Sequence, residues 1–179
     1  IIKANALCNM YGMDTISCGA TISWAMEAWK EGKLTAEDTG GLELNYGDAE
    51  MMVRLTEMIG KREGFGDLLA EGSAMAAKKI GRGTEDYLIT SKGQEAPAHM
   101  PQVKRSLSII YAANPFGADH MSSEHDPSYK SYPERMSYIG LDNPQPKLAL
   151  NVEMMRFATV TQHLSVSYTH LRAHETLQH

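Results

Sequence analysis

The chain has 179 residues and a formal net charge of −5, and 42% of its residues are hydrophobic. This length can bury a sizeable core, and the acidic balance excludes the strongly basic surface typical of proteins that bind nucleic acid or anionic membranes. No apolar run approaches the roughly 20 residues of a membrane-spanning helix, and no signal-peptide pattern opens the chain. We therefore expect a cytoplasmic protein that binds neither nucleic acid nor a membrane.

Two helices joined by a tight turn are predicted at the start of the chain. Residues 1–10 are apolar and rich in alanine, which suits a helix. Gly12 can end this helix, because glycine adopts the left-handed conformation at little cost. Asp14 or Thr15 can cap a second helix over residues 17–31, whose apolar side chains recur at helical spacing.

Two further helices are predicted after a polar connection over residues 33–47, which contains a short turn at residues 35–38. An aspartate can cap a helix over residues 48–61, whose apolar side chains gather on one face. Another aspartate can cap a helix over residues 67–80, which a glycine would then stop. Antiparallel helices with short loops indicate an all-α, bundle-like fold.

The second half of the chain is less regular. Residues 87–90 are strand-like, and two prolines exclude a continuous helix over residues 84–101. Residues 107–113 are expected to return to helix, which the N-P-F-G sequence at residues 114–117 would break. A last amphipathic helix is predicted over residues 147–163, so the whole chain is expected to be mostly α.

Cys8 and Cys18 are the two cysteines of the chain. They are too few for a disulfide scaffold, and their spacing is not the C-x-x-C pattern of metal or cluster sites. We expect both to be small buried core residues, since a free cysteine packs as a small apolar side chain.

The densest polar cluster is D-H-M-S-S-E-H-D at residues 119–126. His120 and Glu124 lie four residues apart, so on a helix they would share a face and could ligate a metal. Gly117 and Pro127 favour a capped, hydrogen-bonded loop instead. We expect no metal ligand in this chain.

The turn over residues 9–15, N-M-Y-G-M-D-T, can be either a ligand site or an ordinary corner. Asn9 and Asp14 can present acceptor oxygens at its apex, and exposed N–H groups of the backbone add donors. The simpler alternative is a helix–glycine–helix turn in which Asp14 only caps the second helix.

This turn resembles the D-x-x-G-L-D-T pterin-binding motif of the tungsten-containing aldehyde ferredoxin oxidoreductase family. The matching stretches follow one another in the same order as in the family and cover about residues 1–160. The resemblance therefore implies an internal fragment of the family's helical domains 2 and 3. Domain 2 would cover residues 1–103 and domain 3 would begin over residues 104–165. The other matching stretches are residues 4–9, 14–17, 25–27, 62–67 and 69–72.

Residues 166–179 read differently, as a translation of the transposase adapter used to prepare sequencing libraries. We expect this tail to be non-native and exclude its histidines from any metal site. A fragment of this kind is expected to be inactive by itself.

The resemblance implies a tungsten or molybdenum bis-molybdopterin cofactor and a 4Fe-4S cluster whose ligands lie outside this chain. The cluster pattern would need cysteines that Cys8 and Cys18 cannot supply at their spacing. Asn9 stands where the type sequences carry an aspartate, and an amide offers a pterin one acceptor oxygen instead of a charged pair. The implied cofactor-binding residues are Asn9, Gly12, Met13, Asp14 and Thr15.

Residues 111–120 are similar to the family's Y-A-T-x-x-R-G-x-x-H, whose histidine lies beside the tungsten. His120 would accordingly move a proton, a task that suits a side chain titrating near neutral pH. Pro115 and Phe116 stand where aldehyde oxidoreductases carry polar or basic residues, which leaves the substrate open.

Residues 92–99 resemble the family's K-G-x-E-x-P-A-H/Y. Glu95 and His99 could therefore lie at the rim of a substrate pocket or belong to a structural turn.

Some members of the family bridge two subunits through a metal held by paired E-x-x-H motifs. Most of those ligands are replaced here, so we expect any homodimer to lack a bridging metal; the corresponding positions are Lys3, Ala6, Glu50 and Val53.

The family chemistry implies oxidation of a small-molecule aldehyde to a carboxylic acid, with ferredoxin or another electron-transfer partner as acceptor. Residues 114–120, N-P-F-G-A-D-H, also resemble the tungsten subunit of benzoyl-CoA reductases, which leaves ring reduction as an alternative. A third alternative is a helical binding module without a cofactor.

Overall fold

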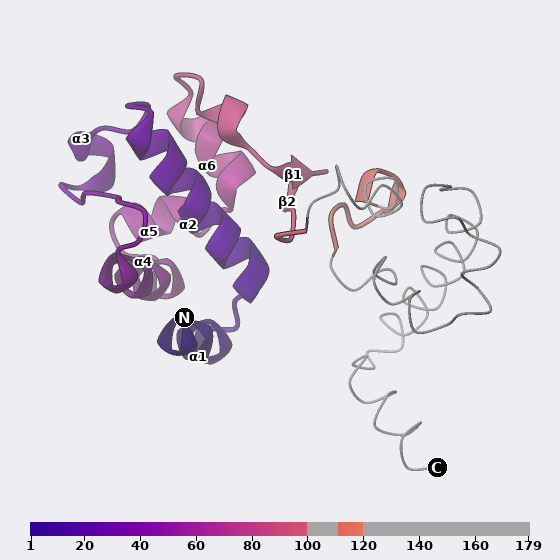
Figure 1. Cartoon of the computed structure of the whole chain (residues 1–179), viewed down its shortest axis with the longest axis horizontal. Helices are drawn as coiled ribbons and strands as arrows, with labels where there is room; N and C mark the ends of the chain where they lie inside the picture. Colours follow the sequence, from indigo (N-terminus) through magenta and orange to yellow (C-terminus); the bar gives the residue numbers. More distant parts are fainter. Residues whose placement is uncertain (100–110, 120–179) are drawn as a thin grey trace, which may run out of the picture. The chain divides into compact units, whose positions relative to one another are not determined.

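The computed structural model describes residues 1–99 and 111–119, and the chain divides into two compact units, residues 1–97 and 98–179 (Figure 1). The first unit is helical, which confirms the all-α expectation. No helix in the described ranges is long and apolar enough to cross a membrane. The elements are α1 (Ile2–Tyr11), α2 (Thr15–Lys30), α3 (Ala36–Thr39), α4 (Ala49–Lys61), α5 (Phe65–Leu69), α6 (Ser73–Ile80), the 3-10 helix η1 (Thr84–Tyr87), β1 (Thr90–Ser91) and β2 (Gln94–Glu95).

Helix α2 runs through the middle of the first unit and contacts α1, α4, α6, η1 and β2 (Figure 1). Its buried side chains include Trp24, Ala25 and Ala28, which repeat at helical spacing. The indole Nε1 of Trp24 donates a hydrogen bond of 2.9 Å to the carbonyl oxygen of Thr84. The core of the unit is therefore built around this one helix.

The connection over residues 33–47 is not simply polar, which corrects the prediction. Leu34, Leu42 and Leu44 are buried in the main hydrophobic cluster. Between them lies α3, whose first turn carries a capping box formed by Thr35 and Asp38. The leucines anchor the segment because their apolar surface is removed from water against the helices.

The single helix predicted over residues 67–80 is wrong, because the segment forms two helices, α5 and α6. Asp67 lies inside α5 and is not its cap. The break falls at Gly72, whose φ of 81° no side-chain-bearing residue adopts readily. Helix α4 ends at Lys61, and its C-cap Arg62 takes the left-handed conformation with a φ of 53°.

Glu95 supplies the cap that α6 lacks locally. Its carboxylate is buried, and Oε1 accepts hydrogen bonds from the backbone N–H of Ser73 (2.8 Å), the hydroxyl of Ser73 (2.8 Å) and the hydroxyl of Thr21 (3.2 Å). A Cβ atom at Gly72 would lie 3.1 Å from Oε1, so the glycine also makes room for the carboxylate. Glu95 therefore has a structural role that joins the hairpin to α2 and α6.

The strand expected at residues 87–90 is displaced. Tyr87 belongs to η1, and the strand begins only at Thr90. β1 pairs with β2 in antiparallel register, Thr90 opposite Glu95 and Ser91 opposite Gln94. The tight pairing follows from the turn at Lys92 and Gly93, which both have positive φ.

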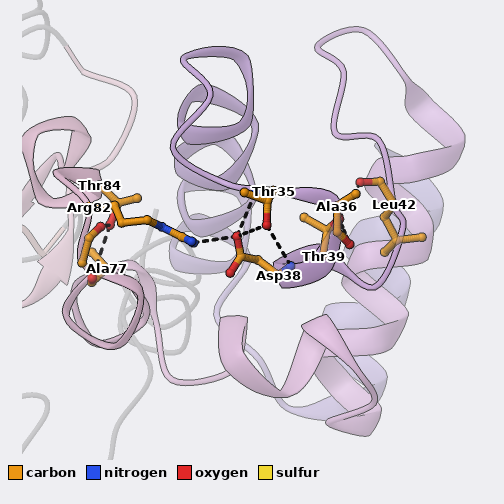
Figure 2. Close-up of polar contacts among 9 residues, drawn as sticks. Thr35, Ala36, Asp38, Thr39, Leu42, Ala77, Arg82 and Thr84 are labelled. Atoms are coloured by element: carbon orange, nitrogen blue, oxygen red, sulfur yellow. Dashed lines mark hydrogen bonds and ion pairs between the residues drawn. The ribbon is translucent and has the colours of Figure 1, made fainter.

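An ion pair links the connection before α4 to the loop after α6 (Figure 2). Arg82 donates a 2.6 Å hydrogen bond to Oδ2 of Asp38, and the same oxygen accepts from the backbone N–H and the hydroxyl of Thr35, both at 2.7 Å. The hydrogen bonds from Arg82 and Thr35 lower the pKa of Asp38 to about 2. The segment that holds α3 is thereby tied to the loop after α6.

In the second unit, residues 111–113 are helical and the helix stops at Asn114, as predicted. The helix predicted over residues 147–163 and the tail over residues 166–179 lie outside the described residues. The domain boundary expected after residue 103 also lies outside them and stays a prediction.

Replacing Glu95 by glutamine is expected to lower the free energy of unfolding by about 1–2 kcal/mol, because the amide oxygen keeps the three hydrogen bonds without the charge that strengthens them and the amide NH₂ is buried in place of Oε2. Equilibrium urea unfolding would measure the change. The matched control is Glu43→Gln, at an exposed glutamate, which should leave the midpoint unchanged. Equal effects of the two substitutions would contradict the capping role of Glu95.

Asp38 should make stability depend on pH in an acidic window. Its pKa is lowered from the ordinary value of 3.8 to about 2, so its contribution is fully present above pH 3.8 and is lost as the pH falls through about 2. Urea unfolding of the wild type and of Asp38→Asn between pH 5 and pH 2 would test this. The stability difference between them should shrink across the window, and a constant difference would refute the assignment.

Candidate functional site

The turn between α1 and α2 has the geometry that its glycine predicts. Gly12 takes a left-handed conformation with a φ of 68° and a ψ of 34°. The N–H of Gly12 donates to the carbonyl oxygen of Asn9 (3.4 Å), and the N–H of Met13 donates to that of Cys8 (2.8 Å). The last carbonyl groups of α1 are thereby partnered before the chain reverses.

Asp14 caps the helix that follows, which settles the choice between Asp14 and Thr15. Its Oδ2 atom accepts a 2.6 Å hydrogen bond from the N–H of Ser17, and Thr15 is the first residue of α2. Oδ1 of Asp14 accepts no hydrogen bond from the described residues. The carboxylate is exposed, so it can cap the helix and still accept a bond from a ligand.

The five residues proposed from the sequence to bind a cofactor share this turn. Asn9 lies in the last turn of α1 and is exposed, as are Gly12, Asp14 and Thr15, while Met13 is half-buried and packs against the core. A carboxamide, a carboxylate and a hydroxyl therefore stand on one short surface segment. Such a set can accept several hydrogen bonds from a ligand with N–H donors.

The base of the turn is fixed by buried packing. Cys8 and Cys18 are free and buried in the main hydrophobic cluster, as expected. Burial raises the pKa of the Cys18 thiol to about 12, and the neighbouring Cys8 adds to the shift. The two helices that flank the turn therefore meet in an apolar contact.

The ring of Tyr11 adds a contact that sequence reasoning missed. A Cβ atom at Gly60 would overlap the ring of Tyr11, so the ring lies directly against the backbone of α4. The signal that could have found this contact was a glycine inside an amphipathic helix, where glycine is otherwise unfavourable.

His120, the proposed proton-transfer residue, lies outside the described residues, as do Glu124, His125 and Asp126. Just before them, Tyr111 and Asn114 are buried. Burial raises the pKa of the Tyr111 hydroxyl to about 12, and the carboxylate of Asp119 adds to the shift. The Tyr111 side chain therefore stays neutral at physiological pH.

The positions that correspond to a bridging metal lie on two helices that contact each other, α1 and α4. Lys3 and Ala6 belong to α1, and Glu50 and Val53 belong to α4. Across residues 1–99 and 111–119, no group of three or more His, Cys, Asp or Glu side chains could hold a metal ion. The expectation of a dimer without a bridging metal stays a prediction.

A family model described as "Aldehyde ferredoxin oxidoreductase, domains 2 & 3" matches residues 1–171. A tungsten-containing aldehyde ferredoxin oxidoreductase of Pyrococcus abyssi is 36% identical over 154 residues, which cover 84% of this chain and 25% of that protein. The enzyme of the same name from Pyrococcus furiosus is 37% identical over 152 residues, with the same coverage. The chain thus spans about a quarter of the length of these curated relatives.

A relative with a different name also matches. The WOR-like subunit of an aliphatic sulfonate oxidoreductase of Pyrococcus furiosus is 35% identical over 129 residues, or 69% of this chain and 20% of that protein. Proteins that are named for different substrates therefore match this chain at similar sequence identity.

Replacing Asp14 by alanine is expected to destabilise the protein by about 1 kcal/mol, because the N–H of Ser17 loses its capping partner. Asp14→Asn should stay close to the wild type, since the amide oxygen can accept the same bond. The free energies of unfolding of the wild type, Asp14→Ala and Asp14→Asn, measured in urea, would distinguish loss of the capping hydrogen bond from loss of the negative charge. An Asp14→Ala protein as stable as the wild type would exclude the capping role.

Proposed function

The chain belongs to the aldehyde ferredoxin oxidoreductase family, and on that premise we propose that its turn at residues 9–15 binds one pterin of a tungsten or molybdenum cofactor. The observation that carries the proposal is the exposed placement of Asn9 and Asp14 on either side of Gly12. The exposed hydroxyl group of Thr15 adds a donor at the first turn of α2.

The chemistry of the turn fits a pterin. The amine and ring N–H groups of a pterin are donors, and Asn9 and Asp14 offer acceptor oxygens within one turn. Asn9 would hold the ring with a neutral amide in place of a carboxylate, so its share of the binding is weaker than a charged pair would give. Asp14 supports binding because its Oδ2 is fixed by the cap while Oδ1 remains available.

In the complete enzyme, the bound metal would supply two-electron redox chemistry. The residues of this chain would bind the cofactor, orient it and move a proton. Asn9 and Asp14 would fix the plane of the pterin, and Gly12 and Met13 would form the turn that presents them. His120 would accept or donate the proton that accompanies oxidation of the substrate.

We propose that the substrate is a small aldehyde, which with water gives a carboxylic acid, two protons and two electrons. A 4Fe-4S cluster, with its ligands outside this chain, would pass the electrons singly to ferredoxin or another electron-transfer protein. The names of the aldehyde ferredoxin oxidoreductase relatives support this choice. The fragment itself would be inactive, because the cluster ligands are absent from it.

A second candidate substrate is an aliphatic sulfonate. It is favoured by the name of the Pyrococcus furiosus relative that matches 69% of this chain. Pro115 and Phe116 also stand where aldehyde oxidoreductases carry polar or basic residues, so the substrate pocket is expected to differ from theirs.

The test is to express the complete protein anaerobically from its uninterrupted reading frame and to measure its metals. We expect about one tungsten or molybdenum atom and about four iron atoms per chain, as a cubane cluster requires. Asn9→Ala should lower the tungsten content and Asn9→Asp should retain it. A stable protein without tungsten or molybdenum would overturn the proposal and favour a helical binding module.

Activity assays on the metal-loaded protein would then choose the substrate. Reduction of ferredoxin with aldehydes, but not with sulfonates or aromatic acyl-CoA, is the expected result. Activity with a sulfonate alone would support the second candidate, and activity with an acyl-CoA alone would replace aldehyde oxidation by ring reduction.

A further inference from the structure

We propose that Gly60 of α4 is a positioning residue for the pterin turn, because it leaves the space in which the ring of Tyr11 docks. The inference rests on the proposed function of residues 9–15. Gly60 would not touch the cofactor itself. It would act through Tyr11, which lies between Asn9 and Gly12 in the same turn.

The contact is close and specific. A Cβ atom built on Gly60 would overlap three ring atoms of Tyr11, Cγ, Cδ2 and Cε2. Overlap with a ring can be relieved only by moving the whole side chain, because an aromatic ring cannot bend around an added methyl group. Tyr11 is the last residue of α1, so the overlap is relieved either by another χ1 rotamer of Tyr11 or by a shift of the end of α1 away from α4.

Backbone conformation does not explain this glycine. Gly60 lies within α4 and is not among the glycines with positive φ. Glycine is unfavourable in a helix interior compared with alanine. Space for the Tyr11 ring is therefore the reason that the structure gives for glycine at this position.

Gly19 provides the matched comparison within the same fold. It also lies inside a helix, α2, and it also lacks a positive φ. A Cβ atom at Gly19 would meet no atom within 4 Å. The difference that matters for the comparison is the room for an added methyl group, which is present at the exposed Gly19 and absent at the half-buried Gly60.

The Tyr11 contact holds one side of the turn, since α1 packs along α4. The other side is held by the Asp14 cap and by the buried cysteines beneath it. If the ring is displaced, Asn9 and Asp14 lose their fixed spacing, although neither residue has been changed. A cofactor that bonds to both residues would be bound less well or in an altered orientation.

The experiment uses the complete protein, expressed anaerobically, with Gly60→Ala, Gly19→Ala, Tyr11→Ala and the double variant Tyr11→Ala/Gly60→Ala. Tungsten per folded chain and the electron paramagnetic resonance spectrum of the metal are the readouts. Gly60→Ala is expected to lower the tungsten content several-fold and to shift the spectrum of the loaded fraction. Gly19→Ala measures the effect of helix propensity on thermal stability.

The double variant keeps the test valid if Gly60→Ala alone folds poorly. Once the ring is absent, alanine at position 60 has room, so the double variant and Tyr11→Ala should carry equal tungsten and give the same spectrum. A Gly60→Ala protein with wild-type tungsten content and spectrum would overturn the positioning role while the proposed function stands. A wild-type protein without tungsten or molybdenum would overturn the proposed function, and the positioning role with it.

Discussion

The buried carboxylate of Glu95, which is 6% exposed, ties together three parts of the first unit that are distant in sequence. A buried charge destabilises a protein unless its hydrogen-bonding capacity is met, and here Oε1 accepts from Ser73 twice and from Thr21 once. Thr21 belongs to α2, and Ser73 begins α6. One side chain therefore fixes the hairpin that carries it, the start of α6 and the middle of α2, the helix whose first turn lies at the candidate pterin site.

The stretch over residues 62–72, which resembles the family so closely, is explained by folding and not by chemistry. Arg62 pairs with Asp67 at 3.1 Å and with Glu71 at 2.8 Å, across the exposed side of the α4–α5 corner. A Cβ atom at Gly66 would collide with the backbone of Met58, so α5 can pack this closely on α4 only with glycine there. Similarity in this region therefore reflects a shared architecture. Arguments about the cofactor and the substrate depend instead on the turn at residues 9–15 and on the residues around His120.

The candidate site combines a rigid base with an exposed, polar apex. The base is apolar, because Cys8 and Cys18 are buried in the main hydrophobic cluster and the ring of Tyr11 lies against α4. The apex carries acceptor oxygens that suit a ligand with N–H groups. The family to which this chain belongs includes relatives that are named for aldehydes and for an aliphatic sulfonate.

The sequence by itself determined the family, the helical class and the helix ends around Gly12, Asp14 and Asp48. The left-handed Gly12, the Asp14 cap and the helix that begins after Asp48 each depend on contacts within a few residues, so their signals lie side by side in the chain. Tertiary structure decided what those signals could not. The division of one expected helix into α5 and α6, the burial of the leucines in the connection after α2, and the docking of Tyr11 on Gly60 arise from partners distant in sequence. Only folding brings such partners together, because the free energy that selects them comes from burial and from hydrogen bonds that no local pattern records.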